Sequence, residues 1–122
     1  MKTNESAENY LETIFMLKKK SGYVRSIDVA HKLSFTKASV SVAMKNFREK
    51  GYITIDENGF TSLTEAGQNI AEKVYERHNV IATLLISFGV DSETAFQDSC
   101  KIEHVISDQS FEKLKQHLSK KQ

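Results

Sequence analysis

The sequence contains no proline and no tryptophan, and it has one cysteine and five glycines among its 122 residues. Because proline interrupts helices, its absence suits a chain dominated by long helices. A single cysteine excludes a disulfide within the chain and favours a reducing, cytoplasmic location. No apolar run approaches the roughly 18 residues of a membrane span. The first residues also lack the basic-then-apolar layout of a signal peptide.

The net charge of +1 conceals an unequal distribution of charge along the chain. From Lys18 to Lys50 there are nine lysines and arginines against two acids, Asp28 and Glu49, an excess of seven positive charges. The remaining residues therefore carry a net charge of −6. A basic block in an otherwise acidic chain indicates a polyanionic partner, with nucleic acid the first candidate. A solvated charged face fits the charge alone equally well.

Three helices are predicted in the first half of the chain. Residues 6–21 carry apolar side chains at intervals of three and four, with Ser6 as the expected N-cap. A short helix opens at Ser26 and is followed by a tight turn. A third helix covers residues 37–50, with Thr36 as its N-cap.

Residues 52–63 change to two β-rich runs around Asn58-Gly59, which predicts a β-hairpin. Three helices followed by a hairpin are the layout of a winged helix-turn-helix, in which the third helix enters the major groove of DNA. The basic block falls on the second and third helices, where that geometry needs it. The DNA-binding residues expected on this basis are Arg25, Thr36, Lys37, Ser39, Ser41, Lys45 and Arg48.

The second half predicts three further helices. One is a long helix after a Thr64 cap, the next runs from Asp91 to Ile106, and the last from Asp108 to about Ser119. The apolar positions of the long helix span more turns than a winged domain covers, which indicates dimerisation. We therefore expect a mainly α protein. Residues 1–63 would form a winged helix-turn-helix DNA-binding domain, and residues 64–122 an α-helical dimerisation and metal-binding domain.

The single cysteine belongs to a candidate metal-binding triplet in "SCKIEH". Cys100, Glu103 and His104 are spaced i, i+3 and i+4, which places them on one helical face. A thiolate, a carboxylate and an imidazole together suit Fe(II), Co(II), Ni(II) or Zn(II), and suit Mn(II) less well because of the sulfur. The plainer interpretation is a small core cysteine beside a surface Glu-His pair.

Signatures of catalysis are missing from the sequence. It has no GxSxG, P-loop, GxGxxG or CxxC motif. His104 is placed to act as a base for Cys100, but no oxyanion-hole loop is evident. We therefore expect a binding protein and not an enzyme.

Four segments resemble the metal-dependent repressors of the diphtheria-toxin-repressor and manganese-transport-regulator family. They are "ENYLETIFML", "LTEAGQNIA", "RHNVIATLL" and "SCKIEHVISD", and the likeness runs in register over residues 8–118. The last segment is the most specific of the four. The chain looks like the short, two-domain architecture of the manganese-type members, without a C-terminal SH3-like domain.

The resemblance implies a set of metal ligands. Cys100, Glu103 and His104 match the ligands of the penultimate helix, and His78 matches the histidine of the long helix. Further members from the first helix are Asn9 and Glu12.

The implied ligand set mixes the two types within the family. Cys100 is as in the iron-type repressors, whereas Glu12 matches a manganese-type ligand. Asn9 stands where iron-type members have methionine and many manganese-type members have aspartate. Ala82 and Phe96 replace two ligands of the iron-type ancillary site, so that site looks broken. The expected cofactor is therefore a divalent transition metal, Mn(II) or Fe(II).

The expected function is that of a metal-dependent transcriptional repressor of metal-uptake genes. Its partners would be a second copy of the chain and a palindromic double-stranded operator, with no membrane partner. An alternative is a winged-helix regulator whose effector site is vestigial or senses oxidation through Cys100. A third alternative is a winged-helix protein-interaction module that does not bind DNA.

Overall fold

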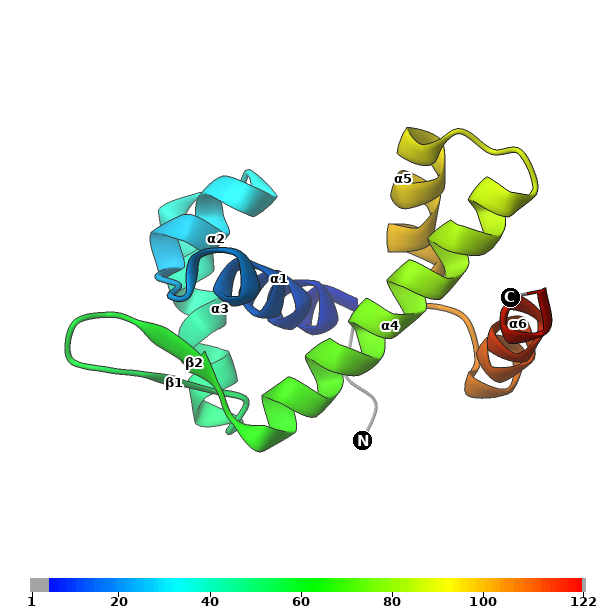
Figure 1. Cartoon of the computed structure of the whole chain (residues 1–122). Coiled ribbons are helices and arrows are strands. Elements are labelled where there is room, and N and C mark those ends of the chain that lie inside the picture. The colour runs from blue at the N-terminus through cyan, green and yellow to red at the C-terminus, as the bar shows by residue number, and fades with distance from the viewer. Residues whose placement is uncertain (1–4, 122) are drawn as a thin grey trace. The chain divides into compact units, whose positions relative to one another are not determined.

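The computed structural model describes residues 5–121 and contains six helices and one two-stranded sheet within that range (Figure 1). The chain forms two compact units that divide inside the long fourth helix, between Glu72 and Lys73. The elements in chain order are α1 (Glu5–Ser21), α2 (Ser26–Leu33), α3 (Lys37–Glu49), β1 (Ile53–Ile55), β2 (Thr61–Leu63), α4 (Glu65–Ser87), α5 (Ser92–Ile102) and α6 (Asp108–Lys121).

The N-terminal unit is built on the apolar faces of α1, α2 and α3. Leu11 and Ile14 from α1 and Val29 from α2 are fully buried and pack with Val40 and Met44 from α3. Burial of these side chains is the main force holding the three helices together. The expected three-helix arrangement is therefore confirmed. The expected Ser6 cap is wrong, because α1 already includes Glu5 and Ser6 lies inside the helix.

The helix-turn-helix and the wing also match the expectation. Ser34 adopts a left-handed conformation at the end of α2, and Thr36 caps α3 by accepting a hydrogen bond from the Ser39 amide at 3.1 Å. Strands β1 and β2 pair antiparallel, with Ile53 opposite Leu63. The turn between them protrudes as a loop from the sheet in Figure 1.

The wing is fixed to the start of α4 by a close backbone approach. A Cβ atom placed on Gly67 would lie 2.0 Å from the Tyr52 carbonyl oxygen, so only glycine fits there. Thr64 caps the helix, since its Oγ1 accepts a hydrogen bond from the Gly67 amide at 3.2 Å and donates one to the Gly51 carbonyl at 2.6 Å.

The C-terminal unit comprises the second part of α4 together with α5 and α6. Val74, Ile81 and Leu84 from α4 are buried, as are Ala95 from α5 and Phe111 from α6. Asp91 is the N-cap of α5, and it accepts a hydrogen bond from the Thr94 amide at 3.0 Å.

The fifth helix is shorter than the sequence indicated, because it ends at Ile102 and not at Ile106. Arg77 of α4 donates hydrogen bonds to the carbonyls of Glu103 at 3.2 Å and Ile106 at 2.9 Å. The side chain of Ser107 then accepts a hydrogen bond from the Ser110 amide at 3.1 Å, which starts the next helix. Glu103 and His104 therefore lie in the turn that follows α5.

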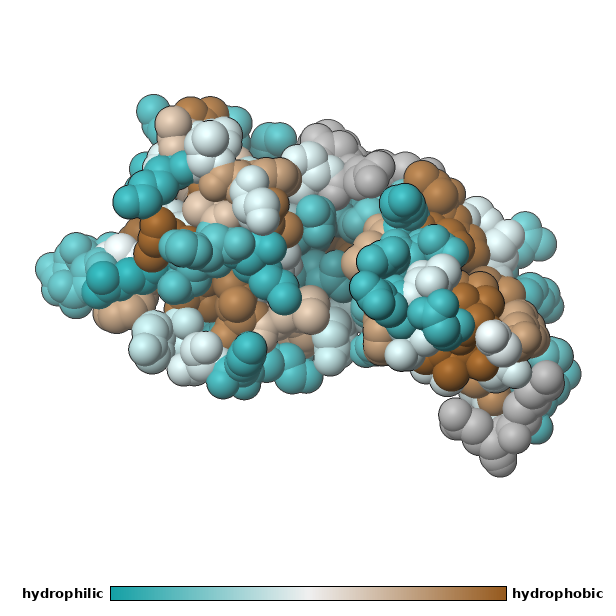
Figure 2. Space-filling model, turned by 90° about the horizontal axis from the view of Figure 1, so that it is seen from above, coloured by the Kyte–Doolittle hydropathy of each residue, from teal (hydrophilic) through white to brown (hydrophobic). Residues whose placement is uncertain are grey.

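Apolar side chains remain on the surface of the C-terminal unit, as Figure 2 shows for one face of the molecule. Its exposed large apolar residues are Ile86, Phe88, Phe96 and Val105. No helix in residues 5–121 is long and apolar enough to cross a membrane.

Candidate metal centre and nucleic-acid interface

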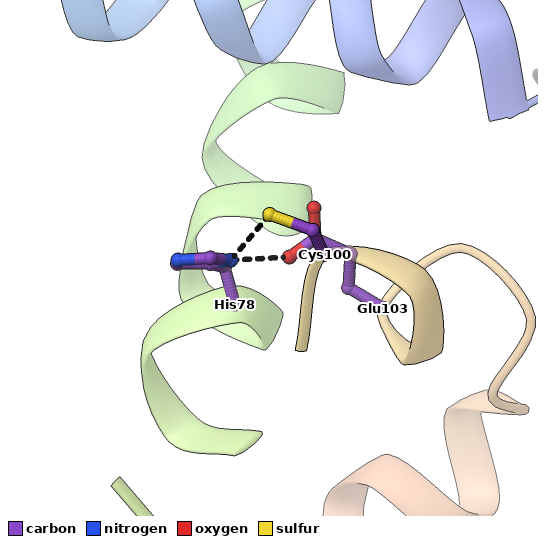
Figure 3. A group of neighbouring side chains, drawn as sticks. All are labelled: His78, Cys100 and Glu103. Carbon is purple, nitrogen blue, oxygen red and sulfur yellow. Dashed lines mark hydrogen bonds and ion pairs between the residues drawn. The ribbon is translucent and has the colours of Figure 1, made fainter. Parts of the chain in front are cut away.

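Three potential metal ligands converge in the C-terminal unit. His78 comes from α4, Cys100 from α5 and Glu103 from the turn that follows α5, and their ligand atoms all lie within 4.8 Å of one another. Figure 3 shows the imidazole of His78 directed at both partners. Among the described residues this is the one group of three or more histidine, cysteine, aspartate or glutamate side chains with such geometry.

The convergence point is one nitrogen of His78. Its Nδ1 lies 3.0 Å from Glu103 Oε2 and 3.6 Å from Cys100 Sγ. The contacts with Cys100 and then with Glu103 raise the pKa of His78 to about 10, although its burial acts in the opposite direction. In the metal-free chain the imidazole is therefore protonated at neutral pH.

Glu103 is buried although it is an acid. Its spacing of four from Ser99 and of eight from Ala95 places it on the inward stripe of the chain, and only 1% of its surface is exposed. Its Oε2 contacts His78, whereas Oε1 has no hydrogen-bond partner and lies 3.4 Å from Nε2 of His104. A buried carboxylate oxygen without a hydrogen bond is a suitable ligand for a cation, because a cation would offset the cost of burying its charge.

His104 adjoins the converging group without joining it. Its side chain is buried, and its Nε2 lies 3.4 Å from Oε1 of Glu103. Asn9 and Glu12 lie in the N-terminal unit one turn apart on α1, with Glu12 buried and Asn9 half-buried. Of the six expected ligands, the structure shows three gathered at one point within the C-terminal unit.

Two side chains at this centre were not predicted from the sequence. The hydroxyl of Ser99 is buried, donates to the Phe96 carbonyl at 3.0 Å and lies 3.0 Å from His78 Nδ1. Arg77 holds the carbonyl of Glu103 in place. The spacing of four residues between Ser99 and Glu103 could have predicted that Ser99 lies on the same helical face. No local sequence pattern predicts the role of Arg77, because its hydrogen-bond partners lie 26 and 29 residues away.

By the family resemblance, Phe96 stands where an iron-type ancillary site would have a second histidine. Its ring stacks on the imidazole of His78, with 5.6 Å between centroids and 16° between planes. Ala82, the other replacement, is buried in α4. Both side chains lack metal donor atoms.

The seven expected DNA-binding residues are all exposed on the N-terminal unit. Thr36 and Ser39 share one hydrogen-bonded cap, with 2.8 Å between their hydroxyl oxygens. The guanidinium of Arg25 lies 4.4 Å from the ring centroid of Phe60, so this residue packs on the base of the wing. Lys37, Ser41, Lys45 and Arg48 all project from α3.

Comparison with known proteins identifies the family. Residues 2–59 match the N-terminal DNA-binding domain of iron-dependent repressors, and residues 64–122 match their metal-binding and dimerisation domain. The chain belongs to the diphtheria-toxin-repressor and manganese-transport-regulator family. The resemblance seen in the sequence is thereby confirmed. So is the expectation of a DNA-binding regulator and not an enzyme, since family members are transcriptional regulators.

Relatives in this family cover most of the chain. A helix-turn-helix transcriptional regulator of Methanocaldococcus jannaschii is 31% identical over 119 residues, which is 96% of this chain and 95% of the relative. The regulator MntR of Bacillus subtilis is 30% identical over 112 residues, 92% of this chain and 79% of the relative.

Solved structures share the fold. A hypothetical protein of Sulfolobus solfataricus superposes with a TM-score of 0.72 at 25% identity, covering 97% of this chain and 91% of its own. The manganese regulator SloR superposes with a TM-score of 0.81 at 25% identity, covering 98% of this chain. This chain spans 55% of the SloR chain.

Proposed function

We propose that this chain is a homodimeric transcriptional repressor of metal-uptake genes, activated by Mn(II) or Fe(II). The observation that carries the proposal is the convergence of His78, Cys100 and Glu103 on one point of the C-terminal unit. The names of its relatives support a metal effector, since they include iron-dependent repressors and manganese regulators.

The donor set fits a divalent transition metal. Sulfur, imidazole nitrogen and carboxylate oxygen form a mixed soft and hard set, which suits Fe(II) better than Mn(II). A bound ion would supply a positive centre that offsets the charge of the buried Glu103 carboxylate. We assign His78, Cys100 and Glu103 as its main ligands and His104 as a fourth. Asn9 and Glu12 stay proposed ligands through the family resemblance alone.

The proposed switch follows from the division of ligands along the chain. We propose that residues 1–63 act as the DNA-binding head and residues 64–122 as the dimerisation and metal-binding part. An ion that takes ligands from α1 and from α5 would order the head relative to the dimer core. Such ordering reduces the entropic cost of binding two half-sites of a palindromic operator. We propose that this metal-dependent repression takes place on DNA, in the cytoplasm.

The DNA contacts are proposed to lie on α3 and around it. Ser41, with Lys37 and Ser39, would approach base edges or phosphates, and Thr36 would act mainly through the cap. Arg25, Lys45 and Arg48 would bind phosphates, which position the protein without reading sequence. A steep loss of DNA affinity with rising salt should follow.

Cys100→Ser tests the metal centre. Apo-protein titrated anaerobically with Fe(II), and separately with Mn(II), should bind at least one ion, and the variant should lose at least about tenfold in Fe(II) affinity. Asp98→Asn is the matched control, because Asp98 is exposed on the same helix and stands outside the donor cluster. Binding no tighter than about millimolar (about −4 kcal/mol) for both ions would contradict a metal switch.

The exposed thiol of Cys100 favours one alternative, a winged-helix regulator that senses oxidation. Measuring DNA affinity in a metal chelator, and separately in an oxidant, distinguishes a metal-activated repressor from a redox sensor. A metal-activated repressor loses affinity in the chelator. A redox sensor responds to the oxidant and keeps its affinity in the chelator.

A further inference from the structure

Val42 is an apolar side chain displayed on the outer face of α3. It is 64% exposed, whereas Val40, Met44 and Phe47 of the same helix are buried. At about 100° per residue, Val42 lies about 200° around the helix from Val40. It therefore points directly away from the core of the N-terminal unit.

The residues beside Val42 allow this face to approach another surface closely. Ala38 and Ser41 are small and exposed, and Lys45 follows one turn later. The first turn of α3 contains no acid. The hydroxyls of Thr36 and Ser39 are joined in the helix cap. The first half of the outer face therefore offers two apolar side chains, one hydroxyl and one positive charge, and exposed Asn46 and Glu49 follow towards the end of the helix.

The major groove has one apolar group that can complement such a surface. Among the four bases only thymine presents a methyl group there, at C5, while the other groove-edge groups are hydrogen-bond donors and acceptors. A valine cannot donate or accept a hydrogen bond, so it discriminates only by apolar contact. An α-helix about 10–12 Å across fits a groove about 12 Å wide.

We propose that Val42 determines DNA sequence preference by van der Waals contact with the C5-methyl group of thymine, with Ala38 beside it. This inference rests on the proposed function of the N-terminal unit as the DNA-binding head. It adds a specificity-determining residue, because lysine contacts with phosphate do not distinguish one sequence from another.

The test begins with a preferred sequence for the full chain. Duplexes are selected from a randomised library with the wild-type protein in whichever of Fe(II) and Mn(II) it binds more tightly, and each thymine of the selected duplex is then replaced by deoxyuridine. This replacement removes only the C5-methyl group. We expect about a fourfold loss of affinity at one or two positions in each half-site, the value for one buried methyl group.

Val42→Ala should bind the thymine and deoxyuridine duplexes equally. The variant should fold, because the position is exposed and alanine has the higher helix propensity. Lys45→Ala is the control on the same helix. It should weaken binding to both duplexes by one common factor and keep the deoxyuridine penalty.

Two results overturn the role of Val42 and leave the proposed function standing. They are a selected sequence with no deoxyuridine effect, and a Val42→Ala variant that keeps the effect. A chain that selects no sequence and shows no salt-dependent DNA binding overturns the proposed function, and this inference with it.

Discussion

Nδ1 of His78 lies 3.0 Å from Oε2 of Glu103, which joins α4 to the turn after α5 through one imidazole and one buried carboxylate. The two residues are 25 positions apart in the sequence. Their contact places a protonated imidazole at the proposed metal centre. In that proposal, metal and proton compete for the same nitrogen.

This competition predicts pH-dependent metal binding. The pKa of His78 is about 10, so the ion must displace a proton at neutral pH. The His78 proton by itself should make the apparent affinity rise by up to about tenfold for each unit of pH between 7 and 9, and a proton released by the Cys100 thiol on metal binding would add to this rise. Calorimetric titration in buffers with different ionisation enthalpies measures the protons released. Glu103→Gln should lower the pKa of His78, and an unchanged value would contradict this explanation.

The same pKa sets the direction of a stability change in the apo-protein. Because the folded pKa of about 10 exceeds the ordinary value of 6.5, His78 stabilises the fold fully below pH 6.5. That contribution should fall as the pH rises towards 10. Urea unfolding of metal-free wild type and His78→Gln across this range should show the difference between the two shrinking as the pH rises.

Arg77 should be needed to hold the turn that carries Glu103. The residue is 8% exposed, and it binds the carbonyls of Glu103 and Ile106 and the carboxylate of Asp108. We expect Arg77→Met to lower the free energy of unfolding by about 2–3 kcal/mol, because these charge-assisted hydrogen bonds are lost. It should also weaken metal binding.

Lys73→Met is the matched control for Arg77. Lys73 binds the same Asp108 carboxylate at 3.1 Å, but its side chain is 59% exposed. An exposed ion pair of this kind contributes less than about 1 kcal/mol. Equal losses from the two variants in urea unfolding would show that burial of Arg77 does not matter.

Thr36 should affect DNA binding mainly through the cap of α3. Thr36→Ala removes the hydroxyl that accepts from the Ser39 amide and should cost about 1 kcal/mol of stability. Thr36→Ser keeps that oxygen and should restore most of the stability. Thermal unfolding and DNA affinity are measured for both. A Thr36→Ala variant with full stability and weak DNA binding would instead indicate a direct DNA contact.

Gly67 should tolerate no side chain. A Cβ atom would lie 2.0 Å from the Tyr52 carbonyl, so Gly67→Ala must push the wing away from α4. We expect a loss of about 2 kcal/mol or more in urea unfolding, despite the better helix propensity of alanine. Asn69→Ala, two residues later on an exposed face of α4, should leave stability unchanged or slightly higher. A stable Gly67→Ala variant would mean that the wing does not pack as described.

The winged head could be predicted from local signals in the sequence. Thr36 as a cap, Asn58-Gly59 as a turn and the apolar spacing of α3 each depend on neighbours within a few positions. Such short-range preferences can be predicted from the sequence because they do not depend on tertiary packing. The triplet of Cys100, Glu103 and His104 was visible for the same reason, since one turn of helix sets its spacing.

Tertiary structure alone decided which of these residues meet. Arg77 ends α5 early by binding carbonyls 26 and 29 positions away, which moves His104 into a turn, beside Glu103 and outside the donor cluster. Packing of α4 against α5 places His78 against both Ser99 and Glu103. Local spacing fixes the face of a helix on which a donor lies. The partner it faces depends on long-range packing, which no short stretch of sequence encodes.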